Sequence, residues 1–90
     1  MHFEWNPDKA KKNLRKHKIS FEEASSVFYD PLAVTGNDPD HSIGEERMIT
    51  FGISSSGRLL VVAHTDRGNA IRIISARYAT RNEIKIYEEK

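Results

Sequence analysis

The chain has 90 residues, of which 38% are hydrophobic and 30% charged, with a net charge of +1 and no cysteine. This length accommodates one core rather than two, so we expect a single domain over residues 1–90, and the apolar content is too high for a wholly disordered chain. The lack of cysteine excludes disulfides, thiolate metal sites and cysteine nucleophiles. The longest apolar run, residues 59–63, is too short to span a bilayer, and the N-terminus lacks the layout of a signal peptide. We therefore expect a cytoplasmic protein without membrane contact.

The N-terminal segment predicts a short strand followed by a helix. Residues 3–5 alternate between apolar and polar side chains, as a short strand does. Asn6 has the position of an N-cap and is followed by proline, which the first helical position tolerates because its N–H would have no partner there. We expect this helix over residues 7–17, with Ala10 and Leu14 on its inner side and its lysines outside.

A second helix is predicted to begin at Phe21. Ser20 and Glu23 have the spacing of a capping box, in which each residue satisfies a backbone N–H of the other. The helix should end at Asp30, because the proline that follows disfavours a helical conformation there. Its expected apolar stripe consists of Phe21, Ala24, Val27 and Phe28.

The rest of the chain predicts a sheet and a closing helix. Residues 35–46 form a polar segment rich in turn-forming residues, which we interpret as a loop. Three strands with short turns between them are then expected, at residues 47–53, 59–65 and 70–77. Thr80 and Glu83 repeat the capping-box spacing and predict a third helix, with Ile84 and Tyr87 facing inward. The expected fold class is α+β. We expect a small antiparallel sheet, made of a three-stranded meander plus a short N-terminal strand, with two N-terminal helices and a C-terminal helix on one face.

Arginines are segregated in the second half of the sequence. From Arg47 to Arg81 there are six arginines, no lysine and one acid, Asp66. A guanidinium is a planar fork that matches phosphate or carboxylate, so this pattern favours a binding face, although single strand arginines often only keep a sheet soluble. Side-chain alternation places Arg77 on one face of its strand and Arg72 on the other, unless a bulge intervenes.

The histidines give little indication of a metal. None of the four has the spacing of a recognised ligand motif. His17 suits a helix C-terminus, and His64, within an apolar strand, is better explained as a hydrogen-bonded structural residue than as a base. His41 lies in the polar segment among acids and close to Arg47, where an imidazole can exchange protons with a substrate; the alternative is a solvated loop histidine.

A site that contains arginines, a histidine and a carboxylate, but no metal, is suited to phosphoryl transfer at a phosphodiester. The arginines would hold the phosphate and the charge of the transition state, while His41 or Glu46 moves a proton. RNA brings its own nucleophile, the 2′-hydroxyl, so a protein need only orient it. The residues alone support binding of phosphate or carboxylate and nothing narrower.

Several segments of the sequence resemble the BrnT family of bacterial type II toxins. The similar segments are FEWNPDKAKKNLRKHKISFEEASSVFYDP, the spacing D-x-x-H-S-x-x-E-E-R at residues 38–47, LLVVAHTDRG and IRIISARYATRNEIKIYE. The resemblance covers residues 3–88. It implies a RelE-like fold, metal-independent cleavage of RNA, inhibition of translation, no cofactor, and neutralisation by a cognate antitoxin of the BrnA type.

The resemblance also assigns candidate site residues. The family's polar signature falls on His41, Glu46, Arg47, Arg67, Arg72, Ser75, Arg77 and Arg81. The expected catalytic set is Arg67, Arg77, Arg47, His41 and Glu46. The expected RNA-binding set is Arg72, Arg81 and Ser75. Two positions depart from the family pattern: Lys18 replaces a glycine between the first two helices, and His64 stands where an aromatic residue is expected.

Two other functions use the same arginines. The first is a non-catalytic module that binds RNA or an acidic protein, because guanidinium groups also bind carboxylates. The second is a toxin homologue that has lost its activity. For an active toxin we expect a tight complex with a ribbon-helix-helix antitoxin, which alone would contact operator DNA.

Overall fold

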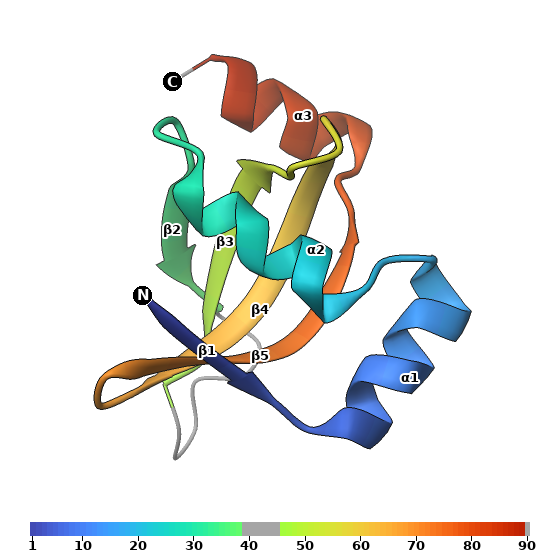
Figure 1. The fold of residues 1–90 in the computed structure, drawn as a ribbon. Coiled ribbons are helices and arrows are strands. Elements are labelled where there is room, and N and C mark those ends of the chain that lie inside the picture. Colours follow the sequence, from blue (N-terminus) through green and yellow to red (C-terminus); the bar gives the residue numbers. More distant parts are fainter. Residues whose placement is uncertain (39–45, 90) are drawn as a thin grey trace.

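The computed structural model describes residues 1–38 and 46–89. Its elements in chain order are β1 (His2–Trp5), α1 (Pro7–His17), α2 (Phe21–Ser26), the 3₁₀ turn η1 (Val27–Tyr29), β2 (Val34–Asn37), β3 (Met48–Ile53), β4 (Leu59–Arg67), β5 (Ala70–Tyr78) and α3 (Arg81–Glu88). The fold is α+β, as expected (Figure 1).

The sheet of the described residues has five strands in the order β1-β5-β4-β3-β2. The predicted antiparallel meander of β3, β4 and β5 is confirmed. The prediction of a purely antiparallel sheet is wrong, because β1 pairs with β5 in parallel. The prediction of a loop from residue 35 is also wrong, since β2 pairs antiparallel with β3. This edge strand, VTGN, has only one apolar side chain and therefore lacks the alternation that marks a half-buried strand.

A β-bulge interrupts the pairing of β4 with β5. Ala63 pairs with Ser75, whereas the next residue, His64, pairs with Ile73, so Ile74 is an extra residue on β5. One inserted residue shifts the alternation of the strand. Every side chain beyond the bulge therefore points to the opposite face of the sheet from the one that regular alternation would give. Arg72 consequently lies on the same face as Ser75 and Arg77, and the alternation that separated Arg72 from Arg77 does not hold.

One face of the sheet is covered by α1, α2 and η1, and the core lies between these layers. The hydrophobic core cluster consists of Ile19, Phe21, Ala24, Val27, Leu60, Val62, Ile73 and Ala76. The predicted stripe of the second helix is thus confirmed for Phe21, Ala24 and Val27. Their burial of apolar area is the main stabilising contribution to the fold.

Helix α1 buries a polar residue instead of the predicted leucine. Leu14 is 51% exposed, whereas Asn13 is 7% exposed. The Asn13 side chain accepts a hydrogen bond from the Ala76 amide and donates one to the Ile19 carbonyl, both at 3.0 Å. Because both ends of the amide have partners, its burial is compensated. Asn13 therefore joins α1 to β5 and to the segment before α2.

The helix ends follow the predicted caps with one exception. The side chains of Asn6, Ser20 and Thr80 each accept hydrogen bonds from backbone amides of the first helical turn. The capping box of α3 is complete. In α2 only half of the box forms, because the Glu23 carboxylate accepts from the Nε of Arg58 at 2.9 Å. This pairing with Arg58 lowers the pKa of Glu23 to about 2.

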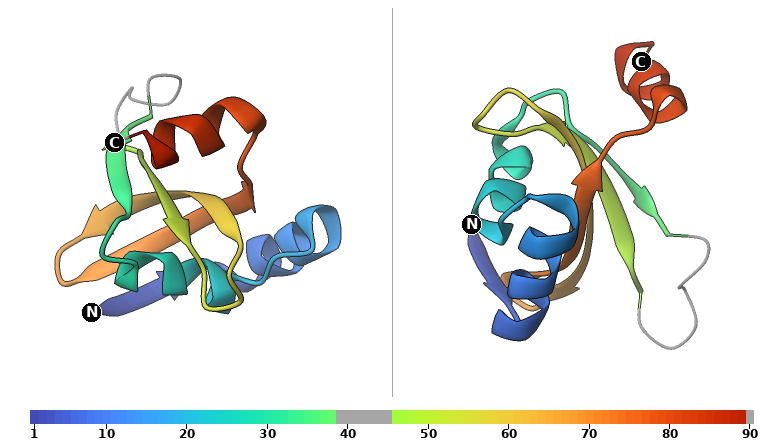
Figure 2. Two further views of the ribbon diagram at one scale, coloured as in Figure 1. Left: turned by 90° about the horizontal axis from the view of Figure 1, so that it is seen from above. Right: turned by 90° about the vertical axis from the view of Figure 1, so that its right-hand side faces the viewer.

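Helix α3 lies on the side of the sheet opposite to α1 and α2, near the end of β5 (Figure 2). The prediction that all helices cover one face is therefore wrong. Tyr87 turns inward and its hydroxyl donates to Asp30 Oδ2 at 2.6 Å, whereas Ile84 is 38% exposed. The described helices include none that is long and apolar enough to cross a membrane.

Candidate functional site

The sheet face opposite α1 and α2 carries five of the predicted site residues. Register places Arg72 beside Thr65, Ser75 beside Ala63 and Arg77 beside Val61. By alternation Arg67 shares the side of Thr65, and Arg47, which directly precedes β3, shares the side of Ile49. We call this surface the arginine face; its members are Arg47, Arg67, Arg72, Ser75 and Arg77.

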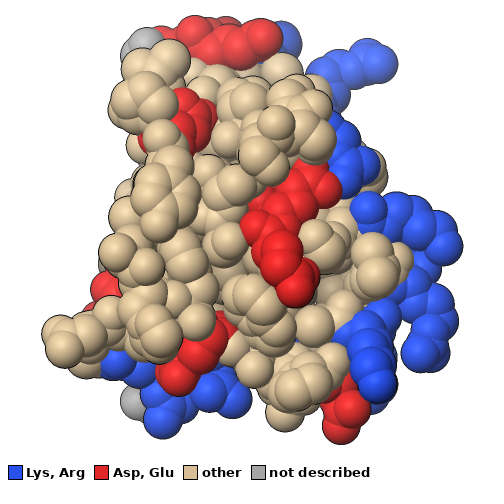
Figure 3. Space-filling model, viewed as in Figure 1, with Lys and Arg blue, Asp and Glu red and all other residues tan. Residues whose placement is uncertain are grey.

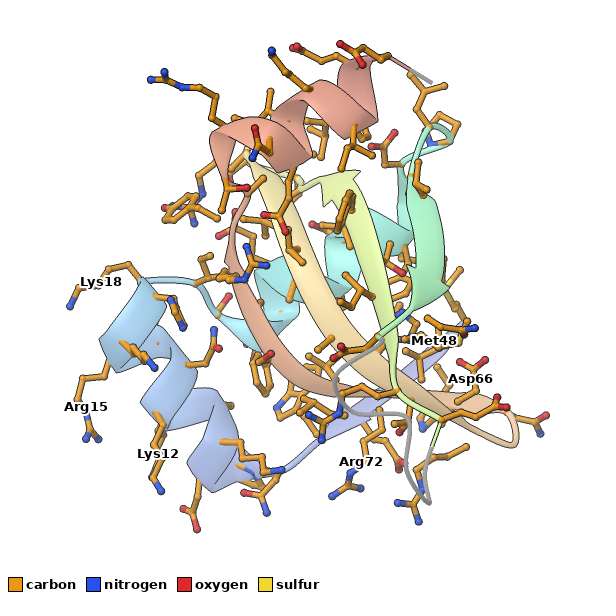
Figure 4. All side chains as sticks on the ribbon, turned by 180° about the vertical axis from the view of Figure 1, so that it is seen from behind. Lys12, Arg15, Lys18, Met48, Asp66 and Arg72 are labelled. Carbon is orange, nitrogen blue, oxygen red and sulfur yellow. The ribbon has the colours of Figure 1, made fainter. Side chains whose placement is uncertain are left out.

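The two sides of the molecule differ in charge. On the helix-covered side, acidic groups lie over α2, and lysines and arginines gather at the edge formed by α1 (Figure 3). The arginine face is seen from behind, where Arg72 lies below the centre of the sheet (Figure 4). Its floor between the arginines is apolar and includes the half-buried Ile49 and Ala63, whereas Val61 beside them is 4% exposed. An anion on this face thus meets guanidinium groups around an apolar surface.

Arg67 and Arg72 share one carboxylate. The Arg67 Nε lies 3.8 Å from Glu4 Oε1, and Arg72 Nη1 lies 3.7 Å from the same oxygen. Glu4 is brought there by the parallel pairing of β1, which places it in register with Arg72. Both distances exceed that of a hydrogen bond, so the guanidinium donors are still available to another acceptor. With two cations for one anion, this pair retains positive charge.

Arg77 is held by helix α3. Its Nη1 and Nη2 donate to Glu83 Oε1 and Oε2 at 2.7 and 2.8 Å, a bidentate pair. The pair lowers the pKa of Glu83 to about 2 and raises that of Arg77. Glu83 also accepts from the Thr80 amide and so couples Arg77 to the helix cap. Arg77 is therefore in part a structural anchor.

The predicted site residues fall into two groups rather than one. Arg47, Arg67 and Arg72 lie toward the β4–β5 turn, whereas Arg77 and Arg81 lie toward α3. Arg81 is the exposed first residue of α3. The bulged segment of β5 separates the groups, with Ser75 exposed between them.

The candidate proton carriers lie near the first group in the sequence. Glu46 is exposed and directly precedes Arg47. His41 lies outside the described residues, so its placement stays a prediction. Neither residue is therefore selected over the other as the proton carrier.

His64 is a structural residue, as the sequence indicated. It is 3% exposed, packs edge-on against Phe28, and its Nε2 forms a hydrogen bond of 2.8 Å with Thr50 Oγ1. Burial lowers the pKa of His64, against the opposing effect of Asp66. A neutral imidazole on the helix-covered side does not reach the arginine face.

Sequence analysis missed two acids that shape this surface. Glu4 and Glu83 bind the arginines, but one does so through parallel strand pairing and the other through the position of α3. Neither arrangement leaves a local signal in the sequence. Among residues 1–38 and 46–89, no group of three His, Cys, Asp or Glu side chains is arranged to hold a metal ion.

Comparison with known proteins identifies the family. Residues 5–83 match the family model described as the ribonuclease toxin BrnT of type II toxin-antitoxin systems. The chain belongs to the BrnT family of ribonuclease toxins. Membership of this family implies that the chain has an RNA substrate and an antitoxin partner.

A solved structure supports the fold. The chain is similar to the crystal structure of the Brucella abortus ribonuclease toxin BrnT, with a TM-score of 0.68 and 21% sequence identity. The match covers 90% of this chain and 99% of that one. At this identity the likeness concerns the fold alone. A search of curated proteins found no match.

Proposed function

We propose that this BrnT-family protein is a metal-independent endoribonuclease of the RelE-like group, which halts translation by cutting RNA. The observation that carries the proposal is the bulge in β5, which places Arg72 on the arginine face. There it lies on the same face as Arg67 and the half-buried Ile49 and Ala63, with donors that Glu4 does not saturate. Such a surface accommodates a phosphate together with the sugar and base attached to it.

The chemistry assigned to this face is attack of the RNA 2′-hydroxyl on the neighbouring phosphorus. The new bond gives a 2′,3′-cyclic phosphate, and the bond from phosphorus to the 5′-oxygen of the next nucleotide breaks, so that this oxygen leaves and takes a proton from water. Arg47, Arg67 and Arg72 would bind the phosphate and stabilise the charge that develops on it. Arg77, which Glu83 holds in place, would contact the substrate at the end of the arginine face nearest α3. The proton of the 2′-hydroxyl would pass to His41 or Glu46.

The decisive experiment is cleavage of RNA by the purified protein in EDTA. We expect cleavage to persist, and Arg72→Ala to lower its rate by about 100-fold or more, as loss of a transition-state donor does. The matched control is Arg15→Ala, an exposed arginine on α1. Equal losses in both variants, or loss of cleavage in EDTA that Mg²⁺ restores, would refute the proposal.

We also propose that the antitoxin is of the BrnA type, with a ribbon-helix-helix domain that alone contacts operator DNA. An acidic surface of the antitoxin would cover the arginine face, because guanidinium groups bind carboxylates as well as phosphates. Co-expression followed by size exclusion should give one peak. Two separate peaks at micromolar concentration would contradict the proposal.

The same assay tests the non-catalytic alternative. A binding module that uses the arginine face would retain RNA without cutting it. Intact RNA together with measurable binding would therefore replace the nuclease by a binding function.

A further inference from the structure

A second basic site lies beside the arginine face, between α1 and β5. It is a pocket of about 300 Å³. Its α1 wall carries Lys9, Lys12, Lys16 and His17, which the helical repeat places on one side of the helix. Its β5 wall is formed by the bulge residue Ile74 and by Ser75. The sequence had indicated only a run of solvated lysines here.

The pocket exists because β1 is shorter than β5. Strand β1 pairs with β5 only as far as Trp5 and Ile73, which leaves the following part of the β5 edge without a strand neighbour. Helix α1 packs along this edge, and Asn13 fixes its position by bonding the Ala76 amide. Because Asn13 uses both of its polar groups in these contacts, the lysines on either side of it are held at the edge of β5.

The charge of this helix favours an anion. Helix α1 contains five lysines and arginines and one acid, Asp8. None of the ion pairs between described residues involves Lys9, Lys12 or Lys16. Lys12 projects from α1 toward the lower edge of the molecule (Figure 4). Lysine is a compact charge that binds phosphate without reading a base, so the pocket suits a sugar-phosphate backbone.

We propose that the pocket binds a backbone phosphate of the RNA strand whose scissile nucleotide lies on the arginine face. This inference rests on the proposed function and extends it to the path of the substrate. Ser75 links the two surfaces, because it lines the pocket and is also an exposed member of the arginine face. The strand crosses the free edge of β5 at Ser75, and a phosphate flanking the cleavage site enters between the lysines.

The test measures binding of 2′-O-methyl RNA, which cannot be cleaved through its 2′ position. The pocket variant is Lys9→Gln/Lys12→Gln/Lys16→Gln. The matched control, Lys11→Gln/Arg15→Gln/Lys18→Gln, removes as many charges from the same segment but none from the pocket lining. Glutamine has a helix propensity close to that of lysine, and circular dichroism checks that both variants fold.

For an oligonucleotide of about 12 residues we expect the pocket variant to bind about tenfold more weakly, with a salt slope smaller by about 0.7, the contribution of one single-stranded phosphate contact. The control variant should stay within about threefold of the wild type. A dinucleotide, whose single phosphate is the scissile one on the arginine face, has no second phosphate for the pocket and should bind the wild type and the pocket variant equally. Equal losses in the two variants, or unchanged binding of the long RNA, would overturn the proposal.

The binding test of the pocket can fail independently of the cleavage test of the proposed function. Cleavage by the wild type combined with equal binding by both variants would refute the pocket and leave the nuclease intact. Selective loss of binding in the pocket variant without any cleavage by the wild type would refute the nuclease alone. If the triple variant does not fold, Lys12→Glu compared with Lys11→Glu makes the same distinction with one charge reversal each.

Discussion

Replacing Glu83 by glutamine distinguishes the contribution of the Arg77 ion pair to the free energy of unfolding from the contribution of the α3 cap. Glutamine at this position still accepts a hydrogen bond from the Thr80 amide, so the capping box is preserved. The bidentate pair with Arg77 is lost, because an amide offers one oxygen and no charge. The change in the free energy of unfolding then reports mainly the pair, with a smaller part from the weaker bond of a neutral amide to Thr80.

The magnitude follows from the pKa of Glu83, which Arg77 above all, together with the hydrogen bonds to Thr80, lowers from 4.5 to about 2. At 1.36 kcal/mol for each pKa unit the upper limit is about 3 kcal/mol. The Arg77 side chain is 41% exposed and that of Glu83 18%, so solvent screening reduces the expected loss at pH 7 to about 1–2 kcal/mol. Because the folded pKa is depressed, this stability is present above pH 4.5 and is lost as the pH falls toward 2.

The assay is urea unfolding of the wild type and Glu83→Gln at pH 7 and at several values between 4.5 and 3. The difference between the two proteins should shrink steadily across that range. Glu88→Gln, an exposed carboxylate at the end of the same helix, is the control and should change stability by less than about 0.5 kcal/mol. A difference that is independent of pH would show that the pair with Arg77 does not stabilise the fold.

Three further predictions concern the fold. Gly52→Ala should cost about 1–3 kcal/mol in denaturant unfolding, because the new Cβ would lie 2.9 Å from the Val27 carbonyl oxygen, whereas Gly36→Ala, with nothing within 4 Å, should not be destabilising. Lys18→Gly should stabilise the protein by about 1 kcal/mol in the same assay, since Lys18 has a left-handed φ of 63°; an unchanged midpoint would contradict this. NMR titration should give a pKa for His64 below 6.5, because burial disfavours the charged imidazole. The stability that depends on the neutral imidazole is therefore lost as the pH falls below 6.5. A titration midpoint at or above 6.5 would show that burial does not control the pKa of His64.

Local features of the fold were predictable from the sequence. The caps at Asn6, Ser20 and Thr80 are confirmed because a capping interaction involves residues only two or three positions apart. The three central strands were predictable because each is a short run rich in apolar and β-branched residues, bounded by turn-forming residues. Strand β2 was missed because it is an exposed edge that needs no such pattern.

The candidate site was only partly predictable. The concentration of arginine in the second half identified the residues, and the family resemblance selected among them. The facing of Arg72 was not predictable, because a bulge depends on how two strands pair and not on the residues of one strand. The pairing of Arg77 with Glu83 likewise depends on the path of the chain into α3.

The sequence by itself determined the fold class, the helix starts, the central meander and the supply of arginine and lysine. Each of these depends on interactions between near neighbours in the chain or on composition. The tertiary structure alone decided which guanidinium groups share a face, that Glu4 lies between two of them, and that α1 forms a lysine pocket along the free edge of β5. These outcomes depend on strand register and strand length, which are properties of pairs of segments far apart in the chain, so no single segment specifies them.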